Sequence, residues 1–185
     1  MVRKWSDGLK TIPKLTLVLG GARSGKTGFA ETLAKASGPK RTYLATAEAM
    51  DDEMAMRIAI HRRERGEGWH TIEEPLDLMG ALKGLDQVVL IDCLTLWLSN
   101  LMHADLPINE ATRGLLRALE ACSHDVILVS NEIGMGLVPD TALGRQFRDA
   151  QGRLNQIIAA RAARVVFVAA GLPLVMKGSL PEGIE

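Results

Sequence analysis

The chain has few aromatic residues, few cysteines and no excess of charge of either sign. Phenylalanine, tryptophan and tyrosine make up 4% of its 185 residues, too few for the stacked rings on which single-stranded nucleic acids bind. Lysine and arginine number 22, as do aspartate and glutamate, so no overall field attracts nucleic acid or an anionic membrane. We therefore expect no nucleic-acid partner, and any site for a polyanion must be local.

The two cysteines, Cys93 and Cys122, stand singly in apolar segments. Isolated cysteines of this kind build neither a disulfide framework nor a zinc site, and they favour a reducing compartment. The least polar stretch, residues 165–176, is interrupted by a glycine and a proline and is too short to span a bilayer. Residues 1–14 lack the apolar core of a signal peptide. These absences predict a cytoplasmic protein without stable membrane insertion.

Short apolar runs alternate with helix-like stretches along the chain. We expect strands at residues 15–19, 41–45, 88–91, 126–130 and 165–169, a further short strand near 69–72, and helices at 26–36, 52–65, 76–83, 94–103, 109–122 and 140–163. Nearly continuous apolar runs are typical of strands buried on both faces, so the pattern predicts an α/β fold with a mostly parallel sheet flanked by helices. No low-complexity linker divides the chain. We expect residues 15–185 to form one domain and residues 1–14 an N-terminal extension.

The long helix expected at residues 140–163 carries apolar residues at three- and four-residue steps. They are Leu143, Phe147, Ala150, Leu154, Ile157 and Ile158. This stripe is expected to face the core.

A glycine-rich motif of the form G-x-x-x-x-G-K-T follows the first strand. Its residues are Gly20, Gly21, Ala22, Arg23, Ser24, Gly25, Lys26 and Thr27. Glycines let the backbone curl so that successive N–H groups point at phosphate oxygens, and the following helix adds its positive end. Lys26 is expected to reach the β- and γ-phosphates, and the Thr27 hydroxyl to bind Mg²⁺. The motif predicts a nucleoside triphosphate site.

An acid at the end of a buried strand completes the expected metal site. Four apolar residues, 88–91, precede Asp92, which would lie at the carboxyl end of the strand, where open α/β sheets bind ligands. This is the arrangement of the acid that holds the metal ion in P-loop enzymes. Asp92 is therefore expected to bind Mg²⁺ together with Thr27.

A histidine stands in an arginine-rich helix expected at residues 52–65. His61 shares a face with Met54 and Ile58, where a histidine is commonly a packing residue. The arginines of this stretch are Arg57, Arg62, Arg63 and Arg65. Their positive charge suits a triphosphate, and a neutral imidazole beside an α-phosphate is a competent nucleophile. The residues alone leave both roles for His61 open.

With these motifs, the sequence resembles the bifunctional adenosylcobinamide kinase / adenosylcobinamide-phosphate guanylyltransferase family. The resemblance is carried by residues 20–27, 43–47, 52–62, 69–73, 92–95, 130–139, 147–149, 152–156 and 171–173. It implies a RecA-like P-loop fold and a homotrimer. It also implies two reactions, in which ATP or GTP phosphorylates adenosylcobinamide and GTP then transfers GMP to that phosphate, giving adenosylcobinamide-GDP.

The resemblance also assigns roles to residues. His61 would be the residue that becomes guanylylated, with Lys26 as the second catalytic group. Besides the phosphate loop, the GTP contacts would be Ala45, Thr46, Ala47, Arg62, Arg63, Glu64, Arg65, Glu73 and Asp92. Mg²⁺ would accompany the nucleotide.

Two other functions and one segment remain open at the level of sequence. A P-loop kinase without nucleotidyl transfer would leave His61 purely structural. A GTP-binding switch would need a guanine-reading N-K-x-D motif, which the sequence lacks. Residues 131–139, which contain two glycines and an acid, would bind substrate, contact another subunit or simply form a turn.

Overall fold

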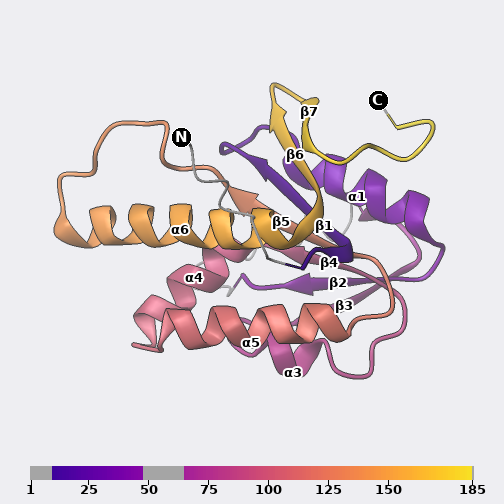
Figure 1. Ribbon diagram of the computed structural model, residues 1–185, viewed down its shortest axis with the longest axis horizontal. Coiled ribbons are helices and arrows are strands. Elements are labelled where there is room, and N and C mark those ends of the chain that lie inside the picture. The colour runs from indigo at the N-terminus through magenta and orange to yellow at the C-terminus, as the bar shows by residue number, and fades with distance from the viewer. Residues whose placement is uncertain (1–9, 48–64, 185) are drawn as a thin grey trace.

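Within the part of the chain that the structure describes, seven strands form one sheet in the order β3-β2-β4-β5-β1-β6-β7 (Figure 1). The structure, a computed structural model, describes residues 10–47 and 65–184. The strands are β1 (Ile12–Gly20), β2 (Arg41–Ala45), β3 (Trp69–Glu73), β4 (Val88–Asp92), β5 (Val126–Asn131), β6 (Ala162–Ala169) and β7 (Leu172–Lys177). All neighbouring strands pair in parallel except β7, which is antiparallel to β6.

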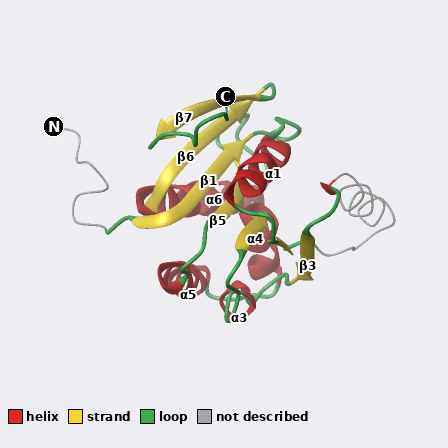
Figure 2. Ribbon diagram, turned by 90° about the vertical axis from the view of Figure 1, so that its right-hand side faces the viewer, coloured by secondary structure: helices red, strands yellow, loops and turns green. Residues whose placement is uncertain are grey.

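Helices cover both faces of the sheet. They are α1 (Lys26–Ser37), α3 (Leu78–Ala81), α4 (Leu94–His103), α5 (Ile108–Ala121) and α6 (Ala142–Arg161). Helix α1 lies on one face, and α3, α4, α5 and α6 lie on the other (Figure 2). None of the helices within the described ranges is long and apolar enough to cross a membrane.

The core has two halves because successive strand residues point to opposite faces. In β4, Val89 and Ile91 pack on the side of α3 to α6, whereas Val88 and Leu90 pack on the side of α1. Apolar residues on both faces explain the nearly continuous apolar runs of the sequence. The expected P-loop (RecA-like) fold, a mostly parallel sheet flanked by helices, is confirmed.

The short strand expected near 69–72 is present as β3. Strands β1 and β6 begin at Ile12 and Ala162 instead of residues 15 and 165, so α6 ends at Arg161 and not at residue 163. The helix expected at 76–83 is the four-residue α3. Strand β7 was not expected at all. Of the helix expected at residues 52–65, only the last residue lies within the described part of the chain.

The expected inner face of α6 is partly wrong. Ala150, Leu154 and Ile158 are buried, but Leu143 and Ile157 are 62% and 39% exposed. Gln151 is fully buried instead. The buried face of α6 therefore includes a polar residue that the apolar pattern of the sequence does not predict.

Candidate active site

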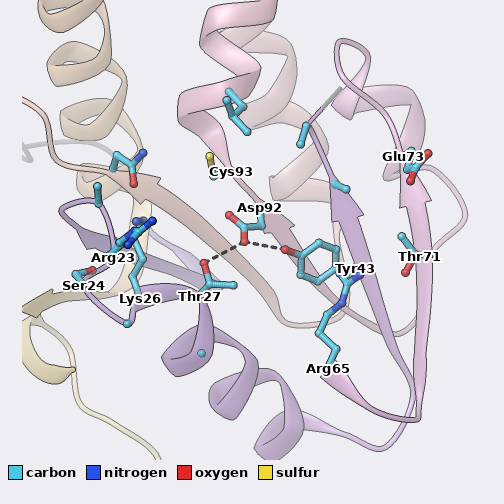
Figure 3. A pocket seen from close by; sticks show the side chains of 17 residues that line it. Arg23, Ser24, Lys26, Thr27, Tyr43, Arg65, Thr71, Glu73, Asp92 and Cys93 are labelled. Carbon is cyan, nitrogen blue, oxygen red and sulfur yellow. Dashed lines mark hydrogen bonds between the residues drawn. The ribbon is translucent and has the colours of Figure 1, made fainter. Parts of the chain in front are cut away.

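A cavity of about 640 Å³ opens at the carboxyl ends of the parallel strands (Figure 3). It is lined by Ala22, Arg23, Ser24, Gly25, Lys26, Thr27, Gly28, Tyr43, Ala45, Ala47, Arg65, Thr71, Glu73, Asp92, Cys93, Leu96 and Asn131. This is the edge at which open α/β sheets bind ligands. The volume is that of a site for a nucleotide-sized molecule.

The phosphate loop curls between β1 and α1. Arg23 and Gly25 both adopt positive φ, at 56° and 91°. Alternation of left- and right-handed residues makes successive N–H groups converge, which forms an anion-binding concavity. Helix α1 then begins at Lys26 with no side chain capping it. Its first N–H groups and its positive end are thus available to a phosphate.

Lys26 lies folded over this loop. Its Nζ donates a hydrogen bond to the Gly21 carbonyl at 3.0 Å. Burial lowers the pKa of the Lys26 ammonium, and the nearby Asp92 carboxylate opposes that shift. A triphosphate in the cavity would stabilise the charged form further, because it brings negative charge beside the ammonium.

Asp92, at the end of β4, receives two hydrogen bonds on the same oxygen. The Thr27 hydroxyl donates to Oδ2 at 3.1 Å, and the Tyr43 hydroxyl donates to it at 2.7 Å. Burial and the Asp92 charge raise the pKa of Tyr43 well above its usual range, so this hydroxyl stays a donor.

This donor set fits a magnesium ion bound with a nucleotide. Magnesium takes hard oxygen ligands, commonly one or two carboxylates with phosphate oxygens and water. Thr27 and Asp92 supply one hydroxyl and one carboxylate at the mouth of the phosphate loop. Across residues 10–47 and 65–184, no three His, Cys, Asp or Glu side chains gather into a metal cluster. Further ligands would therefore come from the nucleotide and from water.

Arg65 stacks on the Tyr43 ring on the far side of the cavity from the phosphate loop (Figure 3). Its Cζ lies 3.5 Å from the ring centroid, and the residue is only 4% exposed. The Trp69 ring meets Tyr43 edge to face with centroids 6.0 Å apart. Strands β2 and β3 and Arg65, which lies four residues before β3, thus meet around one tyrosine.

Thr46 supports the cavity without lining it. Its hydroxyl donates to the Cys93 carbonyl and accepts from the Cys93 N–H, both at 2.8 Å. Its own N–H donates to the Asp92 carbonyl, and its carbonyl accepts from the Asn100 amide. Thr46 therefore joins the ends of β2 and β4, and the nucleotide contact expected of it stays a prediction.

Cys93 lines the cavity but is a poor nucleophile. Burial, reinforced by the adjacent Asp92 charge, raises the pKa of the Cys93 thiol to about 12. Nucleophilic attack requires the thiolate, so this thiol is inert at neutral pH.

A buried polar network holds Asn131 at the end of β5. The Asn131 N–H donates to Thr95 Oγ1 at 2.8 Å, and its carbonyl accepts from Asn155 Nδ2 at 3.0 Å. Asn155 Oδ1 in turn accepts from the Ser130 hydroxyl and from the Gln151 amide, at 2.7 and 3.0 Å. The network fixes one wall of the cavity through α4 and α6.

The structure gathers most of the residues expected at the site. Those that line the cavity are Ala22, Arg23, Ser24, Gly25, Lys26, Thr27, Ala45, Ala47, Arg65, Glu73 and Asp92. Gly20 and Gly21 lead into the loop without lining the cavity. His61, Arg62, Arg63 and Glu64 lie outside the described residues.

Six other residues line the cavity that the sequence did not single out as site residues. They are Gly28, Tyr43, Thr71, Cys93, Leu96 and Asn131. Of these, only Asn131 belongs to a segment, 131–139, for which substrate binding is one of the alternatives that the sequence leaves open. Cys93 and Asn131 lie just beyond the carboxyl end of a predicted strand, which is the signal that could have found them.

Comparison with known proteins agrees with the geometry. The bifunctional adenosylcobalamin biosynthesis protein CobP of Pseudomonas aeruginosa is 48% identical over 167 residues, covering 88% of this chain and 96% of the relative. CobU of Escherichia coli, a protein of the same description, is 40% identical over 88% of this chain and 99% of its own.

A likeness to a solved structure concerns the fold alone. The flagellar accessory protein FlaH of Methanocaldococcus jannaschii matches with a TM-score of 0.52 at 13% identity, over 95% of this chain and 84% of that one.

Residues 16–176 match the family described as CobU, cobinamide kinase / cobinamide phosphate guanyltransferase. The chain therefore belongs to the cobinamide kinase / cobinamide phosphate guanyltransferase family.

Proposed function

We propose that this protein phosphorylates adenosylcobinamide with ATP or GTP and then transfers GMP from GTP to that phosphate, giving adenosylcobinamide-GDP. The observation that carries the proposal is the cavity in which the phosphate loop faces Asp92 and Arg65. Membership of the family supports the two reactions and the corrinoid substrate.

In the kinase step, the chain's own groups bind and orient the triphosphate. The loop N–H groups and Lys26 hold the β- and γ-phosphates. The terminal hydroxyl of the aminopropanol arm of adenosylcobinamide attacks the γ-phosphorus, the bond to the β–γ bridging oxygen breaks, and the hydroxyl proton passes to a phosphate oxygen. Catalysis in such a transfer is mostly positioning and electrostatic stabilisation.

In the guanylyl step, the imidazole of His61 attacks the α-phosphorus and pyrophosphate leaves. The phosphate of adenosylcobinamide phosphate then attacks the histidine-bound GMP and frees the imidazole. Such covalent catalysis splits one difficult displacement into two easier ones. Arg65 is four residues beyond His61 in sequence and lines the cavity. This supports the proposal that the arginines near His61 bind the nucleotide. The proposed further contacts are Arg62, Arg63, Glu64 and Glu73.

Mg²⁺ accompanies the nucleotide in this proposal. Thr27 and Asp92 would hold it, and when bound it would neutralise charge on the β- and γ-phosphates. That would make the nucleoside diphosphate of the kinase step and the pyrophosphate of the guanylyl step better leaving groups.

The finer expectations form part of the same proposal. The enzyme works as a homotrimer in the cytoplasm, residues 15–185 are its catalytic domain, and nucleic acid is not a partner. Large apolar side chains exposed on the edge strand β7 support an assembled state. They are Leu172, Leu174, Val175 and Met176.

Product analysis tests the two reactions. The protein is incubated with adenosylcobinamide, Mg²⁺ and GTP, and the corrinoids are separated and identified by mass spectrometry. Adenosylcobinamide phosphate should form first and adenosylcobinamide-GDP second. Accumulation of the phosphate alone would show a simple kinase, and GTP binding without any product would show a switch.

Lys26→Ala is the matched variant for this assay. Both products should be lost, because both steps use the same phosphate loop. A Lys26→Ala protein with a normal rate of phosphorylation would overturn the assignment of the loop.

A further inference from the structure

Tyr43, which none of the expectations includes as a site residue, contacts both sides of the proposed catalytic cavity. Its hydroxyl donates to Asp92 Oδ2 at 2.7 Å, and its ring carries the Arg65 guanidinium at 3.5 Å. Tyr43 is 6% exposed, and its ring packs edge to face against the Trp69 ring. One rigid aromatic side chain therefore joins a carboxylate to an arginine (Figure 3).

The hydroxyl contact orients the carboxylate. Tyr43 and Thr27 both donate to Oδ2 of Asp92, at 2.7 and 3.1 Å. Hydrogen bonds to an ionised acceptor are shorter and stronger than those between neutral groups. Two donors on one oxygen restrain the carboxylate, and the proposed function leaves its other oxygen, Oδ1, to the metal ion.

The ring contact orients the arginine. A guanidinium over an aromatic face is attracted by the ring quadrupole, most strongly where water is excluded. Arg65 is 4% exposed, and its Nη1 is buried with no hydrogen-bond partner among the described residues. A buried cationic donor without a partner is costly, and an anion in the cavity would satisfy it. A nucleotide phosphate is the anion that suits this cavity.

We propose that Tyr43 is a positioning residue that aligns the metal-holding carboxylate of Asp92 and the phosphate-binding guanidinium of Arg65 on one support. The inference rests on the proposed function, because it assigns the metal and the phosphate to those two groups. Tyr43 itself transfers no proton and forms no bond to the substrate. Its two contacts serve different ligands, so two substitutions separate them.

Tyr43→Phe removes the hydroxyl and keeps the ring. The enzyme with a non-hydrolysable GTP analogue should bind Mn²⁺, used as the probe in place of Mg²⁺, about 10-fold more weakly, as follows from loss of one hydrogen bond to a charged group. Affinity for the nucleotide without metal should stay close to that of the wild type. Electron paramagnetic resonance of free Mn²⁺ measures the metal affinity without turnover.

Tyr43→Leu removes both contacts. In addition to the weaker metal binding, the affinity for the nucleotide without metal should fall about 10-fold, because Arg65 loses its aromatic support. Thr32→Val, which deletes an exposed hydroxyl of α1 bonded only within its own helix, is the matched control and should change neither affinity.

Two results would overturn the inference. One is wild-type Mn²⁺ affinity in Tyr43→Phe. The other is equal metal-free nucleotide affinity in Tyr43→Phe and Tyr43→Leu. Neither titration needs a reaction, so failure of the proposed activities would appear in the product analysis and not here.

Discussion

The Gly171 N–H donates a hydrogen bond of 2.8 Å to the Ser24 carbonyl, and so ties the turn between β6 and β7 to the phosphate loop. The two backbones also touch beside this bond. A Cβ placed on Gly25 would lie 3.2 Å from the Gly171 Cα. The phosphate loop is therefore supported from outside by the antiparallel hairpin at the edge of the sheet.

We expect Gly25→Ala to weaken both nucleotide binding and folding. Gly25 has φ of 91°, where an L side chain costs about 1–2 kcal/mol, and the new methyl group would press on Gly171. The free energy of unfolding should fall by about 2 kcal/mol, and the KM for GTP should rise at least about 10-fold. Urea denaturation and initial rates measure the two effects.

Gly152→Ala is the control for this substitution. Gly152 lies inside α6, and a Cβ there meets nothing within 4 Å. Alanine should raise the free energy of unfolding by up to about 1 kcal/mol, because its helix propensity exceeds that of glycine. If both variants lost stability equally, the Gly171 contact would not be the cause.

We expect Asn155→Ala to be strongly destabilising for a polar substitution. It leaves the Asn131 carbonyl without its side-chain donor, takes away the acceptor of the Ser130 hydroxyl proton and removes one acceptor of the Gln151 amide. Buried groups left unsatisfied cost about 1–3 kcal/mol each, so the free energy of unfolding should fall by about 3 kcal/mol.

The matched control is Asn109→Ala, on the exposed side of α5. It should stay within about 0.5 kcal/mol of the wild type in the same urea denaturation. An equally stable Asn155→Ala protein would mean that the network does not hold the wall of the cavity.

The parts that the sequence predicts well are those set by local chemistry. The phosphate loop follows from glycines, a lysine and a threonine at fixed spacing, and Asp92 follows from four apolar residues before an acid. Both depend on neighbours along the chain. Residues 22–27 of the loop and Asp92 line the cavity.

The parts that the sequence misses depend on residues far apart in the chain. Tyr43 has its role only because Arg65 and Asp92 come to lie beside it. Gln151 is buried where its amide nitrogen donates to Ser130 and Asn155, which no apolar periodicity reveals. Strand β7 was missed because Pro173 is unfavourable in a strand, and it is accepted here at the edge of the sheet.

The high pKa of Cys93 predicts slow alkylation. At pH 9 a thiol with a pKa of about 12 is about 0.1% ionised, whereas a free cysteine with a pKa of about 8.5 is about three-quarters ionised. Iodoacetamide should therefore modify Cys93 several hundred-fold more slowly than free cysteine, and more slowly still at lower pH because the thiolate fraction falls further. Peptide mass mapping over time measures the rate. Rapid modification at pH 7 would show an activated thiol and a rival nucleophile to His61.

The central claim is that one chain carries out both reactions and that GMP passes through His61. The most direct measurement is incubation with GTP labelled at the α-phosphate and Mg²⁺, followed by denaturation and peptide mapping. We predict an acid-labile, alkali-stable label on His61. We also predict that His61→Asn abolishes both the label and the formation of adenosylcobinamide-GDP, while much of the phosphorylation of adenosylcobinamide remains. An active wild-type protein that carries no label, or a label on another residue that persists in His61→Asn, would contradict the account.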